Sequence, residues 1–282
     1  MLKFLTKAII FLGVVVGAIT FVYLYDLYQE IKDDIDSVVN YNPKQSTQFF
    51  DKNGKLLANT FKDENREYVN YDDIPARVIE GLVAIEDTQF FEHFGVNPDA
   101  ISRAVIKNIQ SGGYSEGAST LTQQLIKVLL LSREKKIIRK VKEALLAIRL
   151  ETVLTKEEIL ERYLNHVYFG HGYYGVKTAA KGYFKKNLYE LTLKEIAILV
   201  GLPRAPSFYD PTKNLQVSLA RANQVITRMH TLGWINNEQF EESINETPTI
   251  YNQTLTQNIA PYAIDYAVSE LVNDIPDILY GG

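Results

Sequence analysis

The sequence predicts a mainly α-helical domain with a small β segment at its entry, preceded by one N-terminal transmembrane helix. Three observations predict this fold class. Residues 8–25 carry no charge, two short apolar runs flank an Asn-Gly pair at Asn53-Gly54, and helical periodicity dominates from Ile74 onward. At 282 residues the chain is long enough to bury one large core or two small ones.

The segment Ala8–Tyr25 just reaches, at 18 residues, the length that crosses a membrane as a helix. Lys3 and Lys7 precede it, and four acidic residues follow: Asp26, Glu30, Asp33 and Asp34. This asymmetry places the N-terminus in the cytoplasm and the rest of the chain outside. No small-residue cleavage site of a signal peptide follows, so we expect residues 1–28 to be a cytoplasmic tip and an uncleaved anchor.

Beyond the anchor the sequence predicts a linker, a small sheet and then helices. Residues 29–46 are polar and end in Asn40-Tyr41-Asn42-Pro43, which indicates a linker. Thr47–Ala58 predicts two strands around the Asn-Gly turn, and a strand at Glu67–Val69 would complete the sheet. The expected helices are Pro75–Asp87, Asp99–Gln110, Thr120–Leu131, Glu134–Thr152, Lys156–Asn165, Gly175–Phe184, Leu193–Leu202, Leu215–Leu232 and Asn237–Asn245. Between the second and third, Ser111–Gly117 has the composition of a mobile loop.

Composition excludes several classes of protein. The net charge of −4 provides no basic excess to neutralise phosphates, which argues against a nucleic-acid partner. There is no cysteine, so neither disulfides nor thiolate metal sites can form. The four histidines match no zinc pattern, since even the closest pair, His166 and His171, lacks the i, i+4 spacing of a helical site.

Glu86 and Asp87 stand at the end of the first predicted helix of the domain. One apolar helical face leads up to them, formed by Val78, Leu82 and Ile85. The helix dipole disfavours carboxylates at this end, and three aromatic neighbours would desolvate them: Phe90, Phe91 and Phe94. Both effects raise the pKa of a carboxyl group toward the range useful for proton transfer. Glu86 is therefore a candidate catalytic base, although a surface turn with an aspartate cap explains these residues equally well.

A second group of polar residues follows the predicted loop. Thr120 and Gln123 fit a capping box, so a helix with free N–H groups at its tip begins here, and such a tip attracts anions. Gln123 and Lys127 share one face of this helix. Taken alone, the segment is by default a well-capped amphipathic helix with a solvated lysine.

The next helix brings Arg139, Lys140 and Glu143 close together. Arg139 and Glu143 share a face at i, i+4, and such a surface pair contributes little by itself. Together with Glu86 and Lys127, however, these residues suit a reaction that removes a proton and releases a phosphate.

Four motifs resemble, in order and spacing, those of glycosyltransferase family 51. They are EDxxFxxHxG at Glu86–Gly95, GxSTxTQQLxK at Gly117–Lys127, RKxxE at Arg139–Glu143 and KEEILExYLNxxYFG at Lys156–Gly170. The stretches Leu199–Pro206 and Tyr209–Pro211 also look like the family's. This family comprises the peptidoglycan glycosyltransferase domains of class A penicillin-binding proteins and of monofunctional transglycosylases. The resemblance covers roughly Thr47–Asn245, which we take as the glycosyltransferase domain, residues 47–245.

The resemblance implies a lysozyme-like helical lobe, a second lobe that touches the bilayer, and lipid II as substrate. Glu86 would deprotonate the 4-hydroxyl of the acceptor lipid II. The resulting oxygen would attack C1 of the growing chain with inversion, and undecaprenyl pyrophosphate would leave. Other partners implied are the cytoplasmic membrane, the nascent glycan strand and other cell-wall synthesis proteins. The location implied is the bacterial cytoplasmic (inner) membrane, with the domain on its outer, periplasmic face.

The family's roles carry over to matching positions of this sequence. Glu86 and Glu143 would be catalytic, Glu143 by orienting the basic residues or a divalent metal, Mg²⁺ or Mn²⁺. Substrate would be bound by Ser119, Thr120, Gln123, Gln124, Lys127, Arg139 and Lys140. Structural roles in the first motif would fall to Asp87, Phe90, His93 and Gly95. For Asn165, Tyr168 and Gly170 we expect packing rather than chemistry, and for His166 and His171 satisfied or exposed side chains.

Residues 246–282 resemble the linker that leads to a transpeptidase domain in class A penicillin-binding proteins, and the chain ends there. We therefore expect a part of a bifunctional protein. Ser132-Arg133-Glu134-Lys135 spells SxxK, but it lies between two of the glycosyltransferase motifs and no KTG accompanies it, so cross-linking is not expected. Two other functions remain open: a glycan-cleaving lytic transglycosylase or lysozyme relative, which would not need the basic residues, and a non-catalytic membrane-anchored scaffold.

Overall fold

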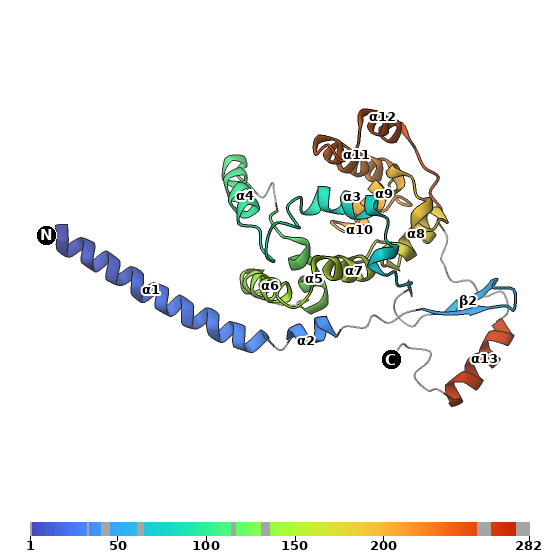
Figure 1. The fold of residues 1–282 in the computed structure, drawn as a ribbon, viewed down its shortest axis with the longest axis horizontal. Helices are drawn as coiled ribbons and strands as arrows, with labels where there is room; N and C mark the ends of the chain where they lie inside the picture. Colours follow the sequence, from blue (N-terminus) through green and yellow to red (C-terminus); the bar gives the residue numbers. More distant parts are fainter. Residues whose placement is uncertain are drawn as a thin grey trace. The chain divides into compact units, whose positions relative to one another are not determined.

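The computed structural model describes residues 2–32, 34–40, 46–60, 65–113, 117–130, 136–252 and 261–274 (Figure 1). Its contacts divide the chain into two compact units. Unit 1 comprises residues 1–41 and 93–154, and unit 2 comprises residues 42–92 and 155–282. The SxxK sequence at 132–135, to which we assigned no cross-linking role, and the middle of the expected loop, residues 114–116, lie outside the described residues.

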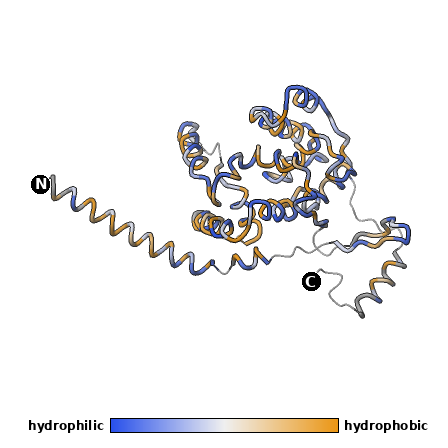
Figure 2. The backbone as a smooth tube through the Cα atoms, in the orientation of Figure 1, coloured by the Kyte–Doolittle hydropathy of each residue, from blue (hydrophilic) through white to orange (hydrophobic). Residues whose placement is uncertain are grey.

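The regular elements in the described part of unit 1 are all helices, apart from an isolated β-bridge between Phe94 and Val96. It contains α1 (Leu2–Ile31), α2 (Asp34–Val39), α4 (Pro98–Ser111), α5 (Leu121–Leu130) and α6 (Lys136–Leu150). The closest packing is between α5 and α6, and both of these helices contact α2. Within α1, the segment Ile9–Ile31 is the one stretch of the described chain that is long and apolar enough to span a membrane (Figure 2).

The described part of the segment that we expected to be a polar linker, 29–46, is largely helical instead. The helix α1 continues to Ile31, and α2 follows almost at once. Leu27 and Ile31 of α1 are buried at a spacing of four residues, and Ile35 and Val38 of α2 are buried at a spacing of three, so each helix has one buried face. Because α1 contacts α6, and α2 contacts both α5 and α6, these faces belong to the core of unit 1.

Unit 2 begins with a two-stranded antiparallel sheet, as predicted. The strands β1 (Thr47–Phe50) and β2 (Leu56–Thr60) pair from Thr47 opposite Thr60, with an irregularity at Phe49/Phe50. Gly54 of the turn has a φ of +81°, a value that glycine tolerates best. The predicted third strand is misplaced: β3 (Asn65–Arg66) pairs in parallel with β4 (Tyr173–Tyr174) and not with the hairpin.

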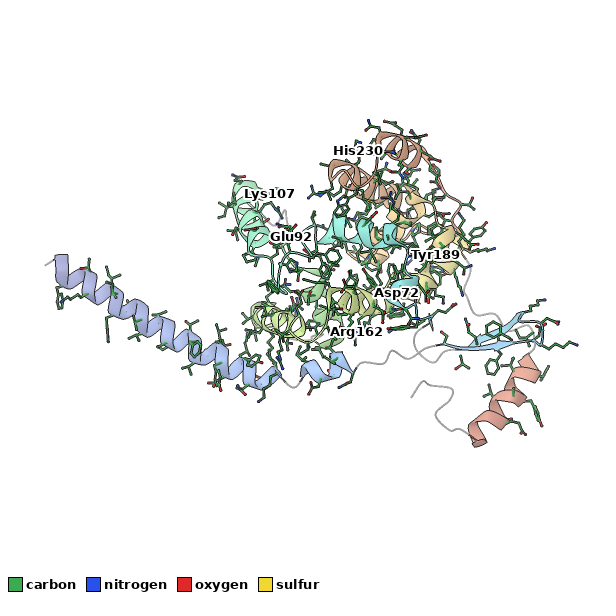
Figure 3. All side chains as sticks on the ribbon, viewed as in Figure 1. Asp72, Glu92, Lys107, Arg162, Tyr189 and His230 are labelled. Atoms are coloured by element: carbon green, nitrogen blue, oxygen red, sulfur yellow. The ribbon has the colours of Figure 1, made fainter. Side chains whose placement is uncertain are left out.

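The remaining elements of unit 2 are helices. They are η1 (Tyr71–Asp73), α3 (Ala76–Glu86), α7 (Lys156–His166), α8 (Val176–Phe184), η2 (Leu188–Glu190), α9 (Leu193–Gly201), α10 (Pro206–Tyr209), α11 (Leu215–Thr231), α12 (Asn237–Asn245) and α13 (Pro261–Asp274). Tyr189 of η2 donates a hydrogen bond to the carbonyl oxygen of Asp72 in η1, at 3.3 Å (Figure 3).

The core of unit 2 forms where α3, α9 and α11 pack against one another. The helix α9 is buried on all sides from Lys194 to Gly201, which explains its nearly continuous apolar sequence. The helices predicted after Ile74 match the observed ones to within two residues at each end, whereas α1 extends six residues beyond each end of the predicted segment 8–25. The mainly α fold class is confirmed. Missing from the prediction were α2, the short α10, and α13.

Candidate functional site

Glu86 is the last residue of α3, one residue before the predicted end of this helix at Asp87. Its carboxylate meets a guanidinium: Arg221 Nη2 donates to Glu86 Oε1 at 3.0 Å. Only 6% of the Arg221 side chain and 9% of the Glu86 side chain are exposed. An opposite charge at this distance favours the ionised carboxylate, the form that accepts a proton.

Arg221 is itself held from several sides within unit 2. Its Nη1 donates to Gln224 Oε1 at 3.2 Å, and its guanidinium carbon lies 5.6 Å from the centroid of the Tyr209 ring. Burial lowers the pKa of the Arg221 guanidinium, and the charge of Glu86 opposes this shift. Two turns further along α11, Arg228 Nη2 donates to Thr88 Oγ1. The helix α11 therefore supports the first motif at two points.

Sequence reasoning missed Arg221, although the sequence contains a signal for it. The buried face of α11 consists of Ser218, Arg221, Ala222, Val225, Ile226 and Met229. An arginine within an apolar helical stripe is costly to bury unless a carboxylate faces it. The pattern thus predicts an acidic partner, but the choice of Glu86 depends on a contact across 135 residues.

The aromatic residues after Glu86 differ from what we expected. Phe90 is fully buried, and the ammonium nitrogen of Lys156 lies 4.4 Å from its ring centroid. Phe91 and Phe94, however, are 53% and 79% exposed. Desolvation of Glu86 by all three rings is therefore wrong, and an arginine is the neighbour that the sequence did not reveal.

The four residues to which we assigned structural roles are all buried: Asp87, Phe90, His93 and Gly95. Gly95 has a φ of +78°, and a Cβ there would come within 2.5 Å of the Ala147 carbonyl group in α6. The Gly95 carbonyl oxygen accepts a hydrogen bond from Thr120 Oγ1 at 2.6 Å. This glycine thus lets the chain run directly against α6.

The capping box at the start of α5 is confirmed. The Gln123 backbone N–H donates to Thr120 Oγ1 at 3.1 Å, and the Thr120 backbone N–H donates to Gln123 Oε1 at 3.0 Å. Both side chains are buried, and their hydrogen bonds stabilise the N-terminal end of α5. Their contact with substrate stays a prediction.

A cluster of charged residues lies on α6, formed by Arg139, Lys140 and Glu143 and called the cation cluster below. Lys140 Nζ donates to Glu143 Oε2 and, at 2.9 Å, to Ser119 Oγ, while Arg139 Nε lies 3.2 Å from Glu143 Oε1. Glu143 is fully buried, whereas 49% of the Lys140 side chain is exposed. Two cations against one carboxylate leave a net positive charge on this part of α6. The cluster can therefore attract an anion.

The other predicted substrate residues lie on α5. Lys127 is exposed in its last turn, and Gln124 is half-buried. Since Gln123 is buried and Lys127 is exposed, these two residues do not present a common surface despite their i, i+4 spacing. Glu86 and Arg221 belong to unit 2, and the cation cluster belongs to unit 1.

The surroundings of Glu143 offer few ligands for the divalent metal that we expected there. Both Glu143 oxygens face cations, and no three histidine, aspartate or glutamate side chains gather in the part of the chain that the structure describes. Magnesium needs oxygen ligands in octahedral order, with few cations nearby. These residues alone do not fit a resident divalent cation, and a metal requirement stays a prediction of the family resemblance.

His166, His171 and His230 lie in unit 2, and each has a polar or charged neighbour. Arg66 Nη1 lies 3.0 Å from His166 Nδ1, which therefore acts as the acceptor, and burial together with Arg66 lowers the pKa of His166 to about 4. His171 Nδ1 lies 3.9 Å from Asp210 Oδ2. His230, near the end of α11, meets Asn237 of α12 at 2.7 Å (Figure 3).

The structure thus shows a mainly helical protein with a helix that can span a membrane, a buried ion pair in unit 2 and a cation cluster in unit 1. The Transglycosylase family profile matches residues 53–230, so the chain belongs to the transglycosylase family. This match confirms the resemblance that the four motifs carry.

Individual relatives agree with this assignment. The chain is 40% identical over 273 residues to penicillin-binding protein 1A of Aquifex aeolicus, covering 96% of this chain and 37% of that protein. It is 38% identical over 261 residues to penicillin-binding protein 1A of Escherichia coli, covering 91% and 31%. The crystal structure of penicillin-binding protein 1A from Haemophilus influenzae aligns at 26% identity with a TM-score of 0.46, covering 83% of this chain and 25% of that one. The chain thus spans about a third of the length of the relatives that it matches.

Proposed function

We propose that this chain is a peptidoglycan glycosyltransferase that polymerises lipid II into glycan strands, as part of a class A penicillin-binding protein. Membership of the transglycosylase family and similarity to proteins named penicillin-binding protein 1A support this proposal. The N-terminal helix would anchor the chain in the bacterial cytoplasmic membrane, with its N-terminus inside and the domain on the outer face.

In the proposed reaction, Glu86 is the general base. Its carboxylate takes the proton of the acceptor's 4-hydroxyl while that oxygen forms a bond to C1 of the growing chain. The bond from C1 to the pyrophosphate oxygen breaks at the same time, on the opposite side, so the anomeric centre inverts. Arg221 keeps Glu86 ionised and fixes its orientation, which is the state that a base needs before it accepts a proton.

The cation cluster on α6 is the observation that carries the proposal. The departing undecaprenyl pyrophosphate gains negative charge, and preorganised cations stabilise such a charge in the transition state. Arg139 and Lys140 are preorganised for this role because both pair with the buried Glu143. Lys140 also donates a hydrogen bond to Ser119. Lys127 would add a third cation. No step of the proposal passes through a metal.

Cation clustering favours the transferase over the two other functions. A lytic transglycosylase or lysozyme relative releases no pyrophosphate, so it would not need Arg139 and Lys140. A membrane-anchored scaffold would need neither these cations nor an ionised Glu86. Proposed partners beyond lipid II and the nascent strand are other cell-wall synthesis proteins, and no nucleic acid is expected.

The test is polymerisation of purified lipid II by the whole chain, beside Glu86→Gln and Lys140→Ala. We expect the loss of the base to slow polymerisation by about 10²–10⁴-fold and the loss of one cation to slow it by about 10²-fold. Lys52→Ala, which removes an exposed lysine from the hairpin turn, is the matched control and should stay within about twofold of wild type.

Each alternative has its own outcome in this assay. Cleavage of preformed glycan without polymerisation would replace the proposal by the lytic enzyme. Full activity of Glu86→Gln would remove the base from the mechanism, and inactivity of the wild type on both substrates would favour the scaffold.

A further inference from the structure

The helix α1 changes its surroundings just beyond Tyr25. Phe21 and Tyr25 are largely exposed, as side chains that face lipid would be, whereas Leu27 and Ile31 are buried. Ile35 and Val38 of α2 continue the same buried row. Since α1 contacts α6, and α2 contacts α5 and α6, the anchor is packed onto the helix that carries Arg139, Lys140 and Glu143.

A charge pair lies at this junction. Lys142 Nζ of α6 donates to Glu30 Oε1 of α1 at 3.2 Å. The Lys142 side chain is only 8% exposed, while that of Glu30 is 64% exposed. A nearly buried ammonium is costly without a facing carboxylate, so Glu30 stabilises this position of Lys142. Lys142 stands between Lys140 and Glu143 in the sequence, so fixing it also fixes the cation cluster.

The position of the pair along α1 sets a depth relative to a bilayer. Glu30 follows Tyr25, the last residue of the uncharged segment, by five residues, or roughly 7–8 Å along a helix. The headgroup layer on each side of the hydrocarbon core is about 5–8 Å thick. A helix that spans the membrane with residues 8–25 therefore brings Lys142, and with it Arg139 and Lys140, to about the level of the lipid phosphates.

We propose that the Glu30–Lys142 pair is a depth clamp, which holds α6 at the height where a membrane-embedded polyprenyl pyrophosphate presents its phosphates. Glu30 and Lys142 are positioning residues in this scheme, acting through Arg139 and Lys140. The inference rests on the proposed function, which supplies the pyrophosphate lipid as ligand. A clamp of this kind matters for a substrate fixed in the bilayer and not for one that moves freely in water.

The experiment compares two substrates with the full chain in lipid vesicles: lipid II in the same vesicles, and a water-soluble lipid II analogue with a short prenyl chain. We expect Glu30→Lys to raise KM for the embedded substrate about tenfold, with kcat within about twofold and KM for the soluble analogue unchanged. Lys142→Glu should behave alike, and the double charge reversal should restore the embedded-substrate KM.

Asp36→Lys is the matched control, since it makes the same charge change at an exposed position of α2 on the same side of the membrane. It should leave both KM values unchanged. The clamp is overturned if Glu30→Lys equals wild type, raises both KM values alike, or is not rescued by Lys142→Glu.

Failure of the proposed function would look different, because wild type would then polymerise neither substrate. Binding of undecaprenyl pyrophosphate in vesicles still tests the clamp in that case. Weaker binding by Glu30→Lys than by Asp36→Lys supports it, and equal binding refutes it.

Discussion

Arg221 Nη2 and Glu86 Oε1 meet at 3.0 Å, although 135 residues separate them in the chain. The pair is almost entirely withdrawn from solvent, and the Tyr209 ring lies beside the guanidinium. In the proposed mechanism this guanidinium favours the ionised form of Glu86, which opposes the effect that the position at a helix end would have alone.

Replacing Arg221 by alanine should therefore change the pH dependence of polymerisation as well as its rate. Loss of the guanidinium favours the protonated, inactive form of Glu86, so the acidic limb of the kcat/KM profile should move to higher pH. At neutral pH we expect a decrease of about 10²-fold, with Arg221→Lys keeping part of the activity. Arg228→Ala, which removes the exposed neighbour that contacts Thr88, should leave the acidic limb in place. An unshifted limb in Arg221→Ala would assign this residue to folding alone.

Asn165 joins two segments of unit 2 that are 96 residues apart. Its Oδ1 accepts a hydrogen bond from the Val69 N–H at 2.8 Å, and its Nδ2 donates to the Val69 carbonyl oxygen at 2.7 Å. Asn165→Ala leaves both buried backbone groups without this partner, so we expect the free energy of unfolding to fall by about 2–4 kcal/mol. Asn245→Ala removes an exposed asparagine that contacts Glu241 and should cost less than about 0.5 kcal/mol. Denaturant titration in detergent measures both, and equal effects would contradict the prediction.

His166 should make the fold sensitive to mild acid. Burial and the neighbouring Arg66 lower its pKa in the folded chain to about 4, below the ordinary value of 6.5. Between these two values the unfolded chain binds the proton more tightly, so stability is complete above about pH 6.5 and decreases as the pH falls toward 4. From pH 7 to pH 5 this histidine should cost about 2 kcal/mol.

His166→Gln is the matching variant for that measurement. Glutamine can accept the hydrogen bond from Arg66 and does not titrate, so the acid-dependent loss of unfolding free energy should become smaller by about 2 kcal/mol. The same loss in both proteins would mean that other groups cause it.

Gly95 and Gly112 provide a paired test of close backbone approach. Both have a positive φ, +78° and +64°, so alanine is strained at either position, by about 1–2 kcal/mol. A Cβ at Gly95 would overlap the Ala147 carbonyl group, whereas one at Gly112 meets nothing within 4 Å. Gly95→Ala should therefore destabilise unit 1 by about 1–3 kcal/mol more than Gly112→Ala. Thermal unfolding compares the two, and similar losses would show that α6 shifts to accommodate the methyl group.

Local patterns were sufficient to predict most of the fold. The apolar stripe that ends at Glu86 and the Thr120–Gln123 capping box depend on neighbours within a few residues, and both are present in the structure. The ion pair between Arg139 and Glu143 is equally local. In contrast, the parallel pairing of β3 with β4 joins residues more than 100 positions apart, and no alternation within two-residue strands reveals it.

The sequence predicted which residues are candidates for the site, but it did not predict all of their contacts. The side chains of Glu86 and Glu143 are both buried and paired with cations. The role of Arg221 as the partner of Glu86, however, depends on the packing of α11 against α3, which the sequence alone does not reveal. Residues 29–46 show the opposite failure. Their polar composition concealed the regular spacing of Ile31, Ile35 and Val38, which a search for helical faces would have found.

The buried row from Leu27 to Val38 also determines where this chain can be shortened for production. A version that begins near Thr47, as the polar composition suggests, would lose four apolar side chains that cover α5 and α6. The uncovered surface would favour aggregation or detergent binding. A version that begins near Asp26 omits the lipid-facing part and keeps these side chains, so it is the better starting point for a water-soluble form.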